Sequence, residues 1–303
     1  MRFTEKIIKA IRDSFDTLLF FATMAVKEDF RNHIKRAGAI DKHPDSKMLI
    51  LGNGPSLREQ MPRLIEAKAW QEGDIMAVNF FAASEEFTVL KPKYYVLSDP
   101  QFFREAGCSD RVMDMYKALA EKVSWPMILY VQYYNPERFD YAKAVEGNPN
   151  IRIVRFHTTL FRGFRNVEFW CYRRGLGSGN FGTVVQNGEF IAMQLGYRTI
   201  ELYGVDHTLL EGLMVDDDNR LCRTQSHYYD SSPAEPKPIF VNATNPPRPY
   251  TMASYLAETA ELFRGHEVLA EYARTEGIRI INRTKGSMID AYEREVASVS
   301  GII

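Results

Sequence analysis

The segment from Met48 to Leu57 reads MLILGNGPSL, and it decides the fold. An apolar run followed by two closely spaced glycines and a serine predicts a buried strand, a tight turn and a helix start. Gly52 and Gly54 would let the backbone approach a ligand, and Ser56 would cap the helix. Exposed amides at such a turn suit a phosphate, although the turn has neither the GxGxxG fingerprint nor a P-loop. The alternative is a tight turn without a ligand.

Short apolar stretches recur along the chain with helical stretches between them, which predicts a parallel sheet covered on both faces. The expected strands are residues 48–51, 74–78, 94–97, 127–131, 151–156, 199–203 and 278–281. Two expected helices, 188–195 and 253–275, end before Gly196 and Gly277. The fold class is therefore α/β, a Rossmann-like, doubly wound and mostly parallel sheet.

We expect two parts in the chain. Residues 1–45 form an N-terminal amphipathic helical segment, and residues 46–303 form the Rossmann-like domain. Within that domain, residues 209–249 are rich in Asp, Asn, Ser, Pro and Tyr and show little periodicity. Such an irregular region is typical of a lid or a binding loop.

The N-terminal segment combines an apolar helical face with cationic flanks. The apolar positions are 3, 7, 8, 11, 15, 18 and 19, and the cations are Arg2, Lys6, Lys9 and Arg12. Two interpretations fit: a helix packed on the domain or on a second subunit of a homo-oligomer, and a helix associated with a membrane surface through residues 1–30. The apolar run 18–26 is shorter than the about 20 residues that cross a bilayer, and it has no secretory signal pattern.

The amino-acid composition limits which binding partners and which cellular compartment we expect. The chain has 303 residues, 45% of them hydrophobic, and a formal net charge of -1. These values are typical of a globular protein. Because a basic excess is lacking, we expect no nucleic-acid partner. Cys108, Cys171 and Cys222 are far apart and form no CxxC pair, which favours the cytoplasm, with or without peripheral attachment to the inner membrane.

Polar residues follow several expected strands. Ligands of open α/β sheets bind beyond the carboxyl ends of the strands, so these side chains should converge. One such residue alone would be an ordinary turn or cap, but their recurrence predicts a shared site. The residues are Asn53, Asn79, Asp99 and Asp206 with its neighbour His207.

Three further segments each allow two interpretations, one functional and one purely structural. Residues 175–183, GLGSGNFGT, precede a helix and either present amides and hydroxyls to a phosphate or form a surface loop. His227 lies in QSHYYD, where it either accepts a proton near neutral pH or is a surface histidine without a role. The acidic run 216–218 either holds a divalent cation or forms a solvated turn.

Four motifs, GNGPSL, SGNFGT, LGYRTIELYGVDH and SHYYD, together resemble the bacterial sialyltransferases of the Campylobacter type, glycosyltransferase family 42. The ending YARTEGIRIINRTKGSMID resembles the MptE-like (DUF115) domains, which include surface-glycan transferases and an archaeal pterin pyrophosphokinase. The matches span residues 46–292. The resemblance implies a GT-A-variant fold. It also implies a metal-independent, inverting transfer of a nonulosonic sugar, sialic acid or Kdo-like, from a CMP-sugar donor to a glycan acceptor of lipopolysaccharide or capsule.

The resemblance also assigns roles by position. His227 matches the general base of the family. The donor nucleotide would be bound by Gly52, Asn53, Gly54, Ser56, Asn79, Asp99, Ser178, Gly179, Asn180, Thr183, Gly204, Val205 and Asp206. Candidates for contact with the leaving group or the acceptor are Thr208, Arg223, Tyr228 and Tyr229. No cofactor is implied, and no residue is assigned as a metal ligand.

The chain departs from the family pattern at three places. Asp99 stands where the family has an asparagine, Thr208 replaces a phosphate-binding tyrosine, and the pair Ser178-Gly179 lies upstream of its aligned position. Two other functions therefore stay open. One is a diphosphotransferase of the pterin pyrophosphokinase kind, in which Asp99 and Asp206 hold Mg²⁺ and ATP is the donor. The other is a nucleotide-binding protein without chemistry.

Overall fold

A computed structural model describes residues 3–42, 45–104, 109–178, 182–224, 228, 235–241 and 248–295. Within these ranges, eight strands form one sheet in the order β13-β12-β6-β1-β2-β3-β4-β5, and each neighbouring pair is parallel. The strands are β1 (Lys47–Leu51), β2 (Gly73–Val78), β3 (Tyr94–Val96), β4 (Met127–Gln132), β5 (Ile151–Phe156), β6 (Thr199–Tyr203), β12 (Arg279–Asn282) and β13 (Glu293–Arg294). The predicted fold class and all seven predicted strands are confirmed.

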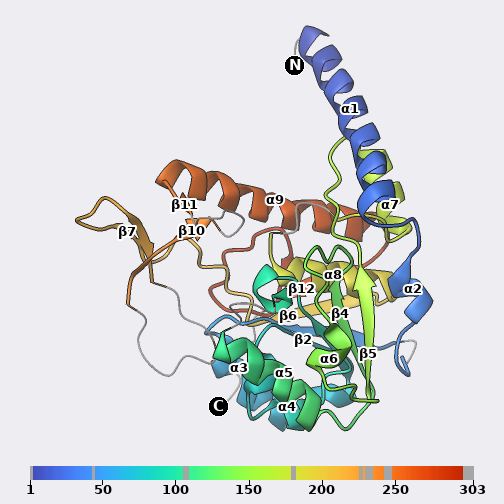
Figure 1. The fold of residues 1–303 in the computed structure, drawn as a ribbon, viewed down its shortest axis with the longest axis vertical. Coiled ribbons are helices and arrows are strands. Elements are labelled where there is room, and N and C mark those ends of the chain that lie inside the picture. The colour runs from blue at the N-terminus through green and yellow to red at the C-terminus, as the bar shows by residue number, and fades with distance from the viewer. Residues whose placement is uncertain are drawn as a thin grey trace.

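Helices cover both faces of the sheet (Figure 1). One face carries α2 (His33–Ala37), α8 (Val184–Gln194) and α9 (Met252–Thr275), and the other carries α3 (Leu57–Glu66), α4 (Phe87–Leu90) and α5 (Asp110–Lys122). Side chains alternate between the faces, so Ile50 of β1 enters one core and Leu51 enters the other. The remaining helical elements are η1 (Ala69–Gln71), η2 (Phe81–Ala83), η3 (Pro100–Phe103), α6 (Tyr141–Ala144) and α7 (Arg165–Arg173).

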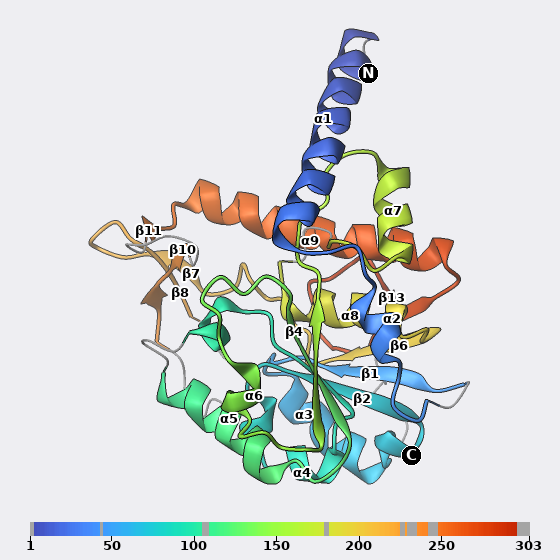
Figure 2. The same cartoon turned by 45° about the vertical axis from the view of Figure 1, so that its right-hand side comes forward.

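The N-terminal helix α1 (Phe3–Lys27) projects from the body of the protein in both views (Figures 1 and 2). Its C-terminal part is anchored, because Phe20 and Met24 are buried in a small cluster with Phe161. The predicted apolar face is present but does not pack on the domain, since side chains such as Ile8 and Leu18 are 67% and 70% exposed. Among the described residues, no helix is both long and apolar enough to cross a bilayer.

The region predicted to be irregular contains short strands where it is described. β7 (Leu213–Val215), β8 (Leu221–Arg223) and β9 (Lys237–Pro238) form an antiparallel sheet, and β10 (Phe240–Val241) pairs with β11 (Arg248–Pro249). Between β7 and β8, Asp216 and Asp218 each form an ion pair with Arg220, at 2.8 and 2.7 Å. This arrangement fits the solvated turn rather than a cation site.

Candidate functional site

A polar cleft of about 570 Å³ lies at the carboxyl ends of the parallel strands. β1 connects to β2 on one side of it, and β6 connects to β12 on the other side, so the chain reverses its direction of winding between β1 and β6. Ligands of open α/β sheets bind at such a topological switch point. Polar residues at the ends of six strands line this cleft. They are Asn53 after β1, Asn79 after β2, Ser98 and Asp99 after β3, Gln132 ending β4, Thr158 after β5 and Asp206 after β6.

The structure brings most of the predicted site residues to this one cleft. The predicted residues that line it are Asn53, Gly54, Asn79, Asp99, Ser178, Thr183, Gly204, Val205, Asp206, Thr208 and Arg223. Gly52, Ser56 and Tyr228 are described but do not line it. Gly179, Asn180, His227 and Tyr229 lie outside the described residues.

The glycine turn after β1 is shaped by packing within the chain. A Cβ atom at Gly52 would lie 2.4 Å from the carbonyl oxygen of Gly204, and one at Gly54 would lie 1.7 Å from Oδ2 of Asp206. Real Cβ atoms do not approach other atoms so closely. Both glycines therefore permit the close approach of this turn to the turn after β6, while Gly54 also lines the cleft.

Ser56 corrects one expectation from the sequence. It precedes α3, but its side chain makes no capping hydrogen bond. Its Oγ instead donates to Oδ2 of Asp206 at 2.8 Å, and its backbone N–H donates to Oδ1 at 3.3 Å. The hydroxyl of Ser56 thus donates to a carboxylate instead of accepting from a backbone N–H of α3, and hydrogen bonds to a charged group are the stronger ones. The predicted cap is therefore wrong, and Ser56 positions Asp206.

The two acidic residues of the cleft are both engaged. Burial raises the pKa of Asp206, and the hydrogen bonds from Ser56 offset part of that rise. The carboxylate of Asp99 accepts a hydrogen bond from the backbone N–H of Gln101 at 3.0 Å and caps η3. The diphosphotransferase alternative requires both carboxylates to hold Mg²⁺ through the lone pairs that these hydrogen bonds leave free.

A helix terminus and a guanidinium give the cleft two groups that favour anions. Thr183 caps α8, its Oγ1 accepting a hydrogen bond from Val185 N at 3.0 Å, and both residues line the cleft. The N-terminus of a helix attracts anions through its dipole and its amides. Arg223 of β8 also lines the cleft, where Nη1 donates to the hydroxyl of Tyr255 at 2.8 Å. Together these groups suit a phosphate.

Among the described residues, three side chains that line the cleft each hold a buried polar atom without a hydrogen-bond partner. The atoms are Asn79 Oδ1, His207 Nε2 and Arg223 Nε. Buried polar atoms are normally paired, and leaving one unpaired costs about 1–3 kcal/mol. These atoms are shut off from solvent, so they lie in the wall of the cleft and add to its polar character.

His207 is held as a neutral imidazole. It takes a left-handed backbone conformation, with a φ of 51°, directly after Asp206. Burial lowers its pKa to about 3, and the neighbouring His266 and Arg223 contribute to the shift. Its ring centroid lies 5.0 Å from that of His266. At neutral pH the side chain offers one donor and one acceptor but carries no charge.

Sequence reasoning missed several cleft residues. Ser98, Gln132 and Thr158 follow or end β3, β4 and β5, so the strand-end rule applied to every strand would have found them. The strand-end rule includes His207 as the neighbour of Asp206 but assigns it no function. Asn187 lines the cleft from the first turns of α8, where its Nδ2 donates to the carbonyl of Thr183 at 3.3 Å. No sequence pattern marks it.

Tyr228 lies outside the cleft, in the core beneath the turn after β1. Its ring stacks on Phe81 with centroids 6.1 Å apart, and burial, together with a hydrogen bond to Glu86, raises the pKa of its hydroxyl. The backbone N–H of Tyr228 donates to the carbonyl of Asn53 at 2.9 Å. Tyr228 therefore ties its segment to the cleft, and its buried hydroxyl does not fit the predicted contact with a leaving group or acceptor.

No family model and no curated protein matches the sequence. The solved structures that resemble this one include two glycosyltransferases. The Maf glycosyltransferase of Magnetospirillum magneticum is 15% identical with a TM-score of 0.46; the match covers 85% of this chain but only 34% of that protein, about a third of its length. The sialyltransferase CstII of Campylobacter jejuni, solved with the substrate analogue CMP-3FNeuAc, is 16% identical with a TM-score of 0.42, and the match covers 82% of this chain and 85% of that one.

Proposed function

We propose that this protein is a glycosyltransferase that moves a nonulosonic sugar, sialic acid or Kdo-like, from a CMP donor to a hydroxyl of a bacterial surface glycan. The observation that carries the proposal is the cleft at the switch point, where polar residues at the ends of six strands lie together with the N-terminus of α8 and Arg223. A nucleotide sugar supplies both donors and acceptors for such side chains. Its phosphate suits the N-terminus of α8 beside Arg223.

The reaction requires few groups from the protein. The acceptor oxygen attacks the anomeric carbon of the sugar, the bond to the CMP phosphate breaks, and CMP leaves with the electron pair. His227 takes the proton of the acceptor hydroxyl in this proposal. The role of His227 rests on its match to the general base of the resembling family. Asn79 and Asp206 would contact the nucleoside, and Thr183 and Arg223 the phosphate.

A thermal-shift panel tests the donor class. We expect CMP to raise the melting temperature of the full chain more than CDP, UDP, GDP or ATP, and to do so equally with EDTA or Mg²⁺. Saturation at a hundredfold excess over Kd corresponds to about 2.7 kcal/mol of stabilisation, which is readily measured. Arg223→Ala should weaken the CMP shift, whereas Asp217→Asn in the exposed β7–β8 turn should leave it unchanged.

The other outcomes of this panel separate the alternatives. A preference for ATP that needs Mg²⁺, with ATP consumed, would overturn the proposal in favour of a diphosphotransferase. A CMP shift without transfer or hydrolysis of any CMP-activated sugar would leave a binding protein without chemistry.

We also propose that α1 rests on a membrane surface. Its side chains Ile11 and Phe15 are each 65% exposed, and the same helix carries the cations Lys6, Lys9 and Arg12. Such an amphipathic helix lowers its free energy by placing the apolar face among acyl chains and the cations near anionic head groups. The cytoplasmic leaflet of the inner membrane provides that surface.

Co-sedimentation with anionic vesicles tests the membrane proposal. We expect the full chain to sediment with the vesicles and the variant Ile11→Glu to remain in solution, because a carboxylate cannot enter the apolar layer. Met113→Glu is the matched control, since Met113 is 53% exposed on α5 and should not alter sedimentation. A stable dimer that Ile11→Glu dissociates, without vesicle binding, would show that the face serves a second copy instead.

A further inference from the structure

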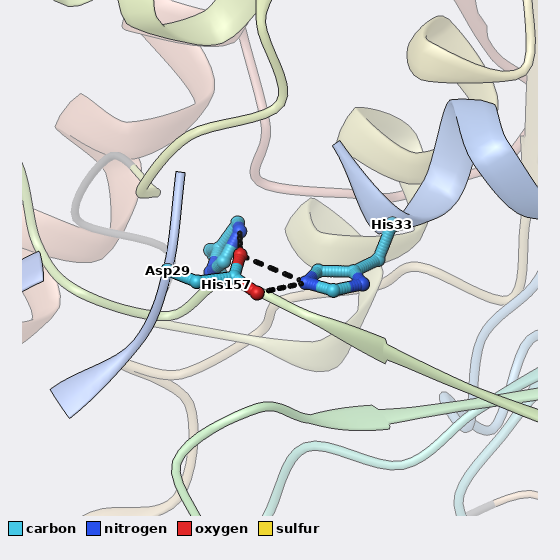
Figure 3. A group of neighbouring side chains, drawn as sticks. All are labelled: Asp29, His33 and His157. Atoms are coloured by element: carbon cyan, nitrogen blue, oxygen red, sulfur yellow. Dashed lines mark hydrogen bonds and ion pairs between the residues drawn. The ribbon is translucent and has the colours of Figure 1, made fainter. Parts of the chain in front are cut away.

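A second cluster of polar side chains lies apart from the cleft, where the N-terminal segment meets the end of β5. Asp29 follows α1, His33 begins α2, and His157 follows β5. Figure 3 shows the three side chains converging. His33 Nε2 lies 2.9 and 3.1 Å from the two carboxylate oxygens of Asp29, and His157 Nε2 lies 3.5 Å from Oδ1 of the same carboxylate.

These separations match a metal site. One ligand atom from each residue falls within 4.8 Å of the others. Nitrogen and oxygen ligands bound tetrahedrally at about 2.0–2.1 Å from zinc lie roughly 3.3 Å from one another. We propose that Asp29, His33 and His157 bind a divalent transition-metal ion, and that Zn²⁺ is the best match. Two imidazoles and one carboxylate favour zinc over Mg²⁺ or Ca²⁺, which take oxygen ligands.

A buried carboxylate orients the central histidine. Nδ1 of His157 lies 3.0 Å from Oε2 of Glu28, and the side chains of the two residues are 1% and 0% exposed. When Nδ1 donates to Glu28 and Nε2 gives up its proton, the lone pair of Nε2 becomes available to an ion beside Asp29. This is the carboxylate–histidine–metal arrangement, in which the outer carboxylate fixes the tautomer and raises the basicity of the ligand.

Without an ion, Nε2 of His157 also lies 2.9 Å from the carbonyl oxygen of Arg31. Metal binding replaces that hydrogen bond by coordination and releases any proton held there. The side chains of Asp29 and His33 are 28% and 26% exposed, and both border a surface hollow of about 1120 Å³. The fourth coordination position therefore faces solvent, where water completes the shell.

The ion would brace the wall of the cleft. Oε1 of Glu28 accepts hydrogen bonds from the backbone N–H groups of Thr158 at 2.9 Å and Thr159 at 3.1 Å, and Thr158 lines the cleft. The three ligands join the connection between α1 and α2 to this loop. The proposed ion would therefore stabilise this wall, and the proposal does not rest on the transferase activity.

Titration with Zn²⁺ tests the site directly. The full chain is stripped with a chelator, dialysed and titrated by calorimetry against ZnCl₂, with Co²⁺ absorption as a spectroscopic probe. We expect one ion per chain and a higher melting temperature. His33→Ala should abolish the tight binding, and Glu28→Gln should weaken it about 10- to 100-fold. Asp217→Asn is the control, because it removes a carboxylate of the exposed β7–β8 turn and should bind zinc as the unaltered chain does.

Circular dichroism establishes that each variant is folded. If folded His33→Ala and folded Glu28→Gln both bind zinc as tightly as the unaltered chain, the proposal is overturned. Tight binding removed by His227→Ala but not by His33→Ala would overturn it as well, since the ion would then lie elsewhere.

Discussion

Replacing His227 with alanine is expected to lower the rate of sugar transfer at least about a hundredfold, the usual scale for loss of a general base. The acceptor hydroxyl is a weak nucleophile until its proton is removed, so transfer depends on the base. Hydrolysis of the donor by water should fall similarly. Donor binding should persist, and the CMP-induced rise in melting temperature should match that of the unaltered chain.

His207 is the rival for this role, because it lines the cleft. Burial lowers its pKa to about 3, and a group this weakly basic removes protons poorly at neutral pH. We therefore expect the acidic limb of the pH–rate profile to vanish in His227→Ala and to persist in His207→Gln, whatever the loss of rate in the latter. Full activity of His227→Ala would exclude it as the base, and Asp217→Asn again serves as the control.

The sheet was predictable because its strands are buried on both faces. Continuous apolar runs such as residues 127–131 have few other interpretations, and glycines marked where the flanking helices end. β13 escaped prediction, since Glu293 and Arg294 carry no apolar pattern and pair only because β12 offers its edge. Local sequence patterns thus specified the buried strands but not the edge strand.

The residues of the site were predictable where the common direction of the strands brings them together. They were not predictable where a hydrogen bond joins residues that are far apart in the sequence. Parallel strands must end at one edge, so Asn53, Asn79 and Asp206 could be grouped without a structure. The hydrogen bond of Ser56 joins residues 150 positions apart, and that of Glu28 with His157 joins residues 129 apart. Such pairs are set by tertiary packing, which leaves no local signature.

Gly52→Ala is expected to destabilise the protein strongly, by at least about 1–3 kcal/mol, the usual cost of overpacking. The obstructing atom is the carbonyl oxygen of Gly204, 2.4 Å from the added Cβ, and Cγ2 of Val205 lies at 3.0 Å. The backbone N–H of Gly52 also donates to the carbonyl of Tyr203 at 2.7 Å, so the two loops cannot separate without losing that bond. Urea unfolding measures the effect as a lower midpoint.

Gly188→Ala is the matched control for this prediction. Its Cβ would meet the flexible Met76 side chain, with Sδ at 3.0 Å, inside helix α8. Alanine in place of glycine in a helix interior favours the folded state by up to about 1 kcal/mol, so this variant should unfold at an equal or higher urea concentration. A Gly52→Ala variant that keeps its urea midpoint but loses its CMP shift would contradict this prediction. The glycine would then be needed for ligand binding, and the loops after β1 and β6 would accommodate the added methyl group.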